Sequence, residues 1–167
     1  MPRVLRTRVS RRAVTTLELL LVVPILVIVL VFCVQFGIVA LYQAAVTHAA
    51  TVAAREAGKA ADLDAVIDVV QQIVGIHGIE IDDDPGSGVK VILEGPAGEP
   101  AREFGDPSLI CPLPANPVEG YQVRVTVCVD LAATRFCDAL AVWGLTFAGR
   151  MLRASSLVML EFEQDAE

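Results

Sequence analysis

Hydrophobic residues along the chain fall into stretches of different period, and the first stretch is continuous. Residues 17–41 form a 25-residue apolar run that holds one charge, Glu18, and one side-chain amide, Gln35. A helix rises about 1.5 Å per residue, so about 20 apolar residues cross a hydrocarbon core of roughly 30 Å. The run therefore predicts one membrane-spanning helix, with length to spare for tilt.

Two helical patterns follow this run. Nine of the eighteen residues 44–61 are alanine, a composition that favours helix and predicts that the membrane helix continues outward. Asp62 or Asp64 can then cap a second helix that Gly75 ends. Its apolar side chains recur at i, i+3, i+4 and i+7, which predicts one buried stripe of Leu63, Val66, Ile67, Val70, Ile73 and Val74.

After residue 76 the period of the pattern becomes two, as in strands. Ile79 and Ile81 alternate with polar residues, and residues 89–93 follow the turn-forming residues 82–88, which predicts a β-hairpin with a long turn. Residues 121–130 alternate most regularly, and residues 149–162 predict a last strand. In the strand over 121–130, one face carries Tyr121, Val123, Val125, Val127 and Val129 and the other carries Gln122, Arg124, Thr126, Cys128 and Asp130.

Two stretches carry no regular period. Residues 95–117 hold six prolines, which fix dihedrals and remove donors, so they predict an exposed loop that could serve as a contact. Residues 132–145 are apolar and include Trp143, the only tryptophan, and they predict either a short helix or a packed loop.

Together these elements predict an α+β fold. A long N-terminal transmembrane helix extended outward is followed by an amphipathic helix and a small antiparallel sheet. The expected organisation is a basic leader over 1–13, the helix and its extension over 14–61, and an extracytoplasmic domain over 62–167.

Charge predicts how this chain is oriented. Residues 42–167 carry eight basic and nineteen acidic side chains, and the positive-inside rule places this acidic part outside the cytoplasmic membrane, with the N-terminus inside. Such an acidic domain argues against nucleic acid as a partner, and the lipid bilayer is the expected one. The leader that stays inside has no acidic residue and contains Arg3, Arg6, Arg8, Arg11 and Arg12.

A cleaved secretory signal is the alternative to a retained anchor. A basic start, an apolar run and the small residues Ala44 and Ala45 fit its outline. The apolar region of a signal peptide is roughly 7 to 15 residues long, however, and the run over 17–41 exceeds that length. Retention in the membrane is therefore the expectation.

Glu18 needs a partner, because placing an ionised carboxylate just inside the edge of a membrane costs several kcal/mol of free energy on most estimates. It can reach the headgroups and pair with Arg11 or Arg12. Alternatively, a neighbouring subunit supplies the positive charge, which would make Glu18 an assembly residue.

Residues 11–24 read Arg-Arg-Ala-Val-Thr-Thr-Leu-Glu-Leu-Leu-Leu-Val-Val-Pro. This string resembles the start of TadE-like proteins of tight-adherence (Flp) pilus systems, which are type IV pilin-like. Glu18 and Pro24 keep the spacing of that family, whereas Ala13 stands where Gly is usual and Leu19 where an aromatic residue is common. Further similar segments are Phe36-Gly37, the Ala-rich residues 44–57 and the strand-like residues 154–159.

The resemblance implies how the chain is processed and assembled. A prepilin peptidase would cut between Ala13 and Val14, and Glu18 of one subunit would meet the new amine of a neighbour. The implied role is that of a membrane-anchored minor pseudopilin-like structural component of a tight-adherence pilus assembly or secretion system. Its partners would be other pilin-like subunits or pilus assembly proteins. The alternatives are a single-pass membrane-tethered interaction or adhesion domain outside any pilus, and an exported enzyme of unrecognised fold.

The remaining candidate residues concern local structure. Pro24 removes a donor from the membrane helix and is expected to kink it. Among the cysteines, Cys128 with Cys137 is the first expected disulfide and Cys111 with Cys128 the second. The sequence has no catalytic, cofactor or metal motif, and the acidic residues 82–84 are expected to form a solvated turn rather than a calcium site.

Overall fold

The computed structural model describes residues 11–59, 63–96, 99–132, 134, 140–141, 144, 146–147 and 149–161, with side chains from Glu18 onward. Most of the basic leader, Asp62, Cys137, Trp143 and the acidic residues 163–167 lie outside the described residues.

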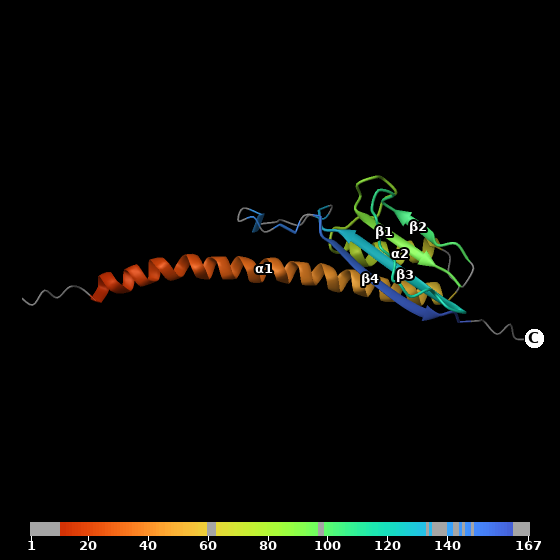
Figure 1. The fold of residues 1–167 in the computed structure, drawn as a ribbon, viewed down its shortest axis with the longest axis horizontal. Coiled ribbons are helices and arrows are strands. Elements are labelled where there is room, and N and C mark those ends of the chain that lie inside the picture. The colour runs from red at the N-terminus through yellow and green to blue at the C-terminus, as the bar shows by residue number, and fades with distance from the viewer. Residues whose placement is uncertain are drawn as a thin grey trace, which may run out of the picture.

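One helix, α1 (Arg11–Gly58), contains both the apolar run and the Ala-rich stretch. It is 48 residues long and continues through Pro24 without interruption. Figure 1 shows α1 as a gently curved rod, with the rest of the chain gathered around its C-terminal half. The chain is therefore a long stalk carrying a small domain at one end.

The second predicted helix is α2 (Leu63–Gly75), and it packs against α1. Of the predicted apolar stripe, Val66, Val70 and Val74 are buried and Leu63, Ile67 and Ile73 are half-buried, so the helix and the centre of its buried face are confirmed. Beyond the helix, the N–H groups of His77 and Gly78 donate to the carbonyls of Val74 and Gly75. Gly78 has φ 71°, the left-handed conformation that commonly follows a helix end.

Four antiparallel strands form one sheet, in the order β2-β1-β3-β4. The strands are β1 (Val89–Glu94), β2 (Arg102–Gly105), β3 (Gln122–Asp130) and β4 (Met151–Met159). In the centre of the sheet, Val127 pairs with Val91 of β1 and with Ala154 of β4. The α+β arrangement of a long apolar helix, a second helix and a small antiparallel sheet is thus confirmed.

The hairpin partner of β1 differs from the prediction. Ile79 and Ile81 are buried but form no strand, because the segment packs beside α2 and the Ile81 N–H donates to the Gln71 side chain at 2.8 Å. The partner of β1 is β2, within the Pro-rich stretch expected to be a loop. The four residues of β2 contain no proline, so each has the donor that a strand requires.

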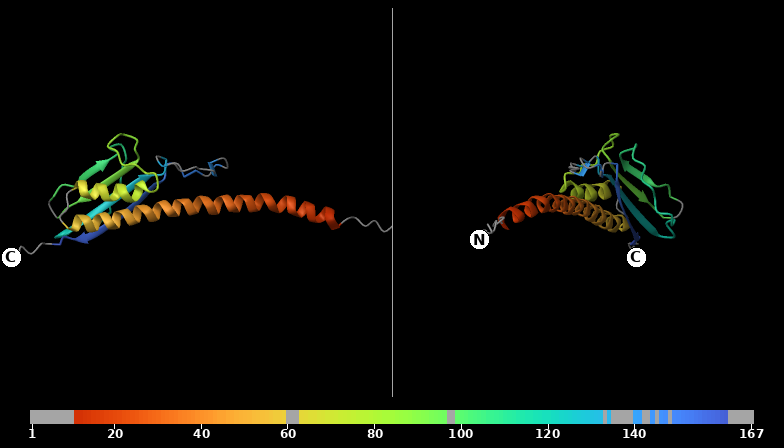
Figure 2. Two further views of the ribbon diagram at one scale, coloured as in Figure 1. Left: turned by 180° about the vertical axis from the view of Figure 1, so that it is seen from behind. Right: turned by 60° about the vertical axis from the view of Figure 1, so that its left-hand side comes forward.

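The core lies between the sheet and the two helices (Figure 2). Alanines along the C-terminal half of α1, among them Ala49 and Ala53, are fully buried against the domain. Their small side chains allow a close approach, and at Gly58 an added Cβ would collide with the Val158 side chain of β4. The Glu161 N–H donates to the Gly58 carbonyl at 2.7 Å, which ties the end of β4 to the end of α1.

The face of β3 that carries polar side chains is also buried. Thr126 and Cys128 are inaccessible, and Arg124 is 5% exposed and paired with Glu94 at 3.3 Å. Covalent attachment through Cys111 holds the chain after β2 against this face. β3 is therefore covered on both faces. Its apolar and polar side chains alternate between two different buried environments.

Asp106 fixes the turns at the base of β1. Its Oδ2 accepts the N–H groups of Gly86 and Gly88 at 3.0 and 2.9 Å, and its Oδ1 accepts the N–H and hydroxyl of Ser108. The Ser108 hydroxyl, helped by the three N–H groups, holds the pKa of Asp106 well below its usual range and outweighs the opposing effect of burial. One carboxylate thus joins two segments that are about twenty residues apart in the sequence.

We expect Asp106→Asn to lower the melting temperature of the full-length protein in detergent, measured by circular dichroism. Because the folded-state pKa lies below the unfolded value of about 3.9, this stabilisation is complete above about pH 5 and is lost as the pH falls below about 4. The difference in melting temperature between wild type and variant should therefore narrow in acid. Asp84→Asn changes an exposed carboxylate of the neighbouring turn and is the control. A difference that stays constant down to pH 3 would contradict this account.

Candidate functional site

The residues that the sequence singled out for processing and assembly lie near the start of α1. Ala13 and Val14 are in its first turn, and Glu18 follows Val14 by one helical turn, on the same side of the helix. The Glu18 side chain is exposed. Within this chain, the structure brings none of these three residues against the sheet domain (Figure 1).

Beyond Glu18, α1 presents an apolar surface that the domain leaves uncovered. The large hydrophobic side chains from Leu19 to Leu30 are exposed. An 18-residue window within Glu18–Gly58 has a mean hydropathy of 3.1, and α1 is the one described helix long and apolar enough to cross a membrane. An uninterrupted apolar surface of this size requires lipid or other helices around it, so α1 is consistent with a single-pass membrane anchor.

Pro24 lies within this exposed part of α1. Its nitrogen carries no hydrogen, so the carbonyl one turn earlier, at Leu20, loses its usual helical donor. The helix nevertheless continues on both sides. A kink at Pro24 stays a prediction.

The domain first meets α1 at its aromatic residues. Phe32 and Phe36 stack with ring centroids 6.0 Å apart, and Phe36 meets Phe147 edge to face at 5.5 Å. Phe147 lies in the connector between β3 and β4 in the sequence, so this contact brings a segment outside the sheet onto α1. Gln35, the one amide of the apolar run, is 3% exposed.

The acidic turn is built as a structural element. Asp83 accepts the Gly105 N–H at 2.8 Å, and the Ser87 hydroxyl donates to the Asp82 carbonyl at 2.8 Å. In the part of the chain that the structure describes, no group of three or more His, Cys, Asp or Glu side chains is placed to hold a metal ion. The Asp83 carboxylate therefore serves a backbone donor.

Residues 13–55 match the family model described as TadE-like protein. The stalk is therefore similar to TadE-like proteins. The match confirms the resemblance predicted from the string around Glu18, and it associates the chain with a structural family of tight-adherence pilus systems. Comparison with curated proteins and with solved structures found no match.

The TadE-like segment, residues 13–55, includes Glu18, Pro24 and most of the Ala-rich part of α1. It ends just before α2, so the sheet and its disulfide lie beyond it. The exposed apolar surface of α1 from Leu19 to Leu30 thus falls within the TadE-like segment.

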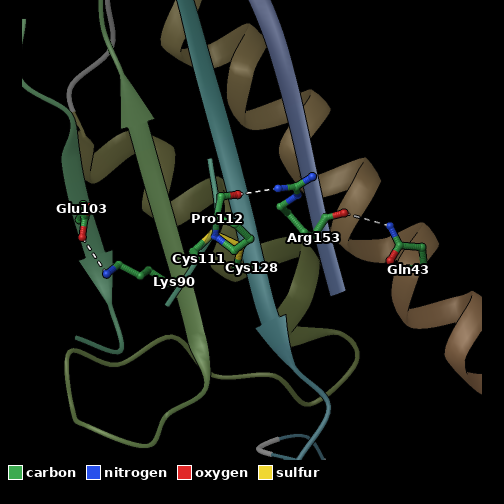
Figure 3. Close-up of a disulfide and its surroundings, with 7 residues drawn as sticks. All are labelled: Gln43, Lys90, Glu103, Cys111, Pro112, Cys128 and Arg153. Atoms are coloured by element: carbon green, nitrogen blue, oxygen red, sulfur yellow. Dashed lines mark hydrogen bonds and ion pairs between the residues drawn. A yellow bond between two sulfur atoms is a disulfide. The ribbon is translucent and has the colours of Figure 1, made fainter. Parts of the chain in front are cut away.

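The disulfide of the sheet joins Cys111 to Cys128 across 17 residues, with a Cα–Cα distance of 6.0 Å (Figure 3). This is the second of the two expected pairings. The first, Cys128 with Cys137, is wrong, because the chain after β2 crosses the face of β3 and brings Cys111 onto Cys128. Cys137 lies outside the described residues, and Cys33 on α1 is free and exposed.

Two hydrogen bonds extend this attachment to β4 and α1. The Arg153 guanidinium donates to the Pro112 carbonyl at 2.6 Å, and the Gln43 amide of α1 donates to the Arg153 carbonyl at 3.3 Å (Figure 3). On the other side of the disulfide, Lys90 of β1 pairs with Glu103 of β2 at 2.7 Å. The outer loop, the sheet and the stalk thus form one connected unit.

Sequence reasoning missed Asp106 and the contact between the connector and α1. For Asp106 a signal exists, since Asp-Pro-Ser is typical of a turn in which the Asp side chain accepts nearby N–H groups. For the connector the sequence shows only apolar composition. Composition alone does not say which surface a segment will cover.

We expect Cys111→Ser to destabilise the full-length protein by about 3 kcal/mol, the loop-entropy value for a crosslink of this span. Thermal unfolding with and without reductant would measure the loss. Cys137→Ser is the matched control and should keep both the crosslink and the melting temperature. Mapping of the crosslinked peptides gives the pairing directly, and a Cys128–Cys137 peptide would contradict the structure.

Proposed function

We propose that this chain is a membrane-anchored, minor pseudopilin-like structural component of a tight-adherence pilus assembly or secretion system. The N-terminus lies in the cytoplasm, α1 crosses the inner membrane and the sheet domain faces outward. The observation that carries the proposal is that the TadE-like match falls on the helix whose apolar surface around Glu18 and Pro24 the domain leaves uncovered. The role is structural rather than enzymatic.

Glu18 is the centre of the proposed assembly step. It is exposed in the single chain and stands at the start of an apolar surface, so association of helices would enclose its carboxylate. Cleavage between Ala13 and Val14 by a prepilin peptidase would create an α-amino group one helical turn from Glu18. The amine of one subunit and the carboxylate of a neighbour would then form an ion pair in a surrounding of low dielectric.

A tethered interaction domain outside any pilus is the second candidate. It is favoured by large apolar side chains on the surface of the sheet domain, where Ile110 is 86% and Met159 72% exposed. Such side chains suit a partner protein that the membrane anchor would only hold in place. This candidate requires neither processing nor co-assembly, so those two measurements separate it from a pseudopilin.

We expect the prepilin peptidase of the same system to remove residues 1–13. Intact-mass spectrometry of protein extracted from membranes, with and without the peptidase, would show a new terminus at Val14. Ala13→Gly restores the residue usual in the family and should raise the cleaved fraction. An intact terminus in both backgrounds would instead support the tethered domain.

We expect Glu18→Gln to reduce co-assembly with pilin-like subunits at least about tenfold, measured by crosslinking in membranes. Breaking one partner of a buried ion pair costs about 3 to 5 kcal/mol, and 1.4 kcal/mol already corresponds to tenfold. Glu119→Gln makes the same change at an exposed position next to β3 and should leave assembly unaltered. If the Glu18→Gln variant crosslinks to pilin-like subunits as strongly as the wild type does, the proposed role of this carboxylate is refuted.

A further inference from the structure

Described residues of the connector between β3 and β4 lie against a part of α1 that belongs to the apolar run. Its Phe147 meets Phe36, and its Leu140 lines a groove together with Phe32 and Val39. The groove has a volume of about 670 Å³. Residues 131–149 contain two charged side chains among nineteen residues, so the whole connector is apolar in composition.

The position of Phe36 along α1 sets the depth of this contact. Phe36 follows Glu18 by eighteen residues, which is about 27 Å along a helix. With Glu18 at the inner edge of a hydrocarbon core of roughly 30 Å, Phe36 lies just inside the outer edge. Phe147, whose ring centroid is 5.5 Å from that of Phe36, must lie at a similar depth.

A polar contact between α1 and the sheet lies beyond that level. Gln43 is about 38 Å along the helix from Glu18, outside the core, and its amide donates to the Arg153 carbonyl. Between the two levels, Arg150 lines the groove and its side chain is exposed. Apolar contacts at Phe36 and polar contacts at Gln43 thus bracket the expected boundary between hydrocarbon and headgroups.

We propose that the groove between α1 and the connector residues Leu140 and Phe147 is a second membrane-contacting surface, immersed in the outer-leaflet interface beside the span. The groove takes an acyl chain of a phospholipid, and the Arg150 guanidinium meets the phosphate. This proposal rests on the membrane anchoring contained in the proposed function. It adds a surface beyond the TadE-like segment, since the connector lies outside residues 13–55.

Lipid is favoured as the occupant by the continuity of the surface. The groove residues Phe32 and Phe36 are on the same helix as the exposed hydrophobic side chains from Leu19 to Leu30, within the run long enough to span a bilayer. A lipid that contacts the span at this level reaches the groove without leaving the membrane. The groove is apolar and has a cation at its mouth. This arrangement matches a phospholipid, in which a charged phosphate lies at one end of the apolar acyl chains.

The test places a single tryptophan at Phe147, by Phe147→Trp in a Trp143→Phe background, because Phe147 lines the groove. Full-length protein is reconstituted into phosphatidylcholine and phosphatidylglycerol vesicles in which acyl chains carry bromine or a spin label at defined depths. Quenching of tryptophan fluorescence should be strongest with the label near the headgroups and weak with the label at the bilayer centre. Acrylamide in the aqueous phase should quench less than it does in the denatured protein.

A second variant in the same Trp143→Phe background carries the tryptophan at a control position. Tyr121→Trp is the control, because Tyr121 is 67% exposed and precedes β3 next to Leu160, beyond Gly58 at about 60 Å along α1 from Glu18. The control should be quenched by acrylamide and by no lipid label.

Three results would overturn the proposal. Full access to acrylamide without lipid quenching would place the connector in water, and protection from both quenchers would mean that a protein, such as a second copy of α1, covers the groove. In either case protein that floats with the vesicles would leave the anchor intact. Protein that fails to float would remove the anchor and this inference together.

Discussion

The close packing of the Ala-rich half of α1 against the sheet is the contact on which the structure depends. The two halves of this single helix lie in different environments. The first half exposes large hydrophobic side chains, and the second half buries alanines in a core. Small side chains keep the helix axis near the sheet, so that β4 can bond to the end of α1 at Gly58. Without this contact the sheet would lose one of the two helices that cover its inner face, and its buried valines would be left without a partner surface.

The opposite face of the sheet is closed by other means. There the chain after β2 is fixed by one disulfide, by Arg153 and by the ion pair between Arg124 and Glu94. A domain of about one hundred residues has little apolar area to spare, and covalent and charged links on one face compensate for the thin layer that covers it. This division leaves the large hydrophobic side chains from Leu19 to Leu30 uncovered by the domain.

Local periodicity decided which parts of the fold could be predicted. The apolar run, the stripe of α2 and the strand over 122–130 repeat at the spacing of their own secondary structure, so the sequence alone locates them.

β2 was missed because the prolines around it suggested a loop, although its four residues are proline-free. The partner of Cys128 depends on where a loop crosses the sheet, and the contact of Phe147 with Phe36 depends on the direction in which the connector returns. Both are tertiary properties that no local pattern encodes. In the stalk, Glu18 and Pro24 could be singled out because their spacing belongs to a family pattern.

The continuity of α1 from the apolar run to Gly58 makes the stalk a lever. From the middle of the apolar run to Gly58 the helix extends about 44 Å, so a change of about 10° in its tilt would displace the far end of the domain by about 8 Å. Rotation of the helix about its own axis would likewise turn the sheet through the same angle, because β4 and the outer loop are bonded to the stalk. A rearrangement of neighbouring helices within the bilayer would therefore be felt outside it as a movement of the sheet, with no flexible joint in α1 to absorb it.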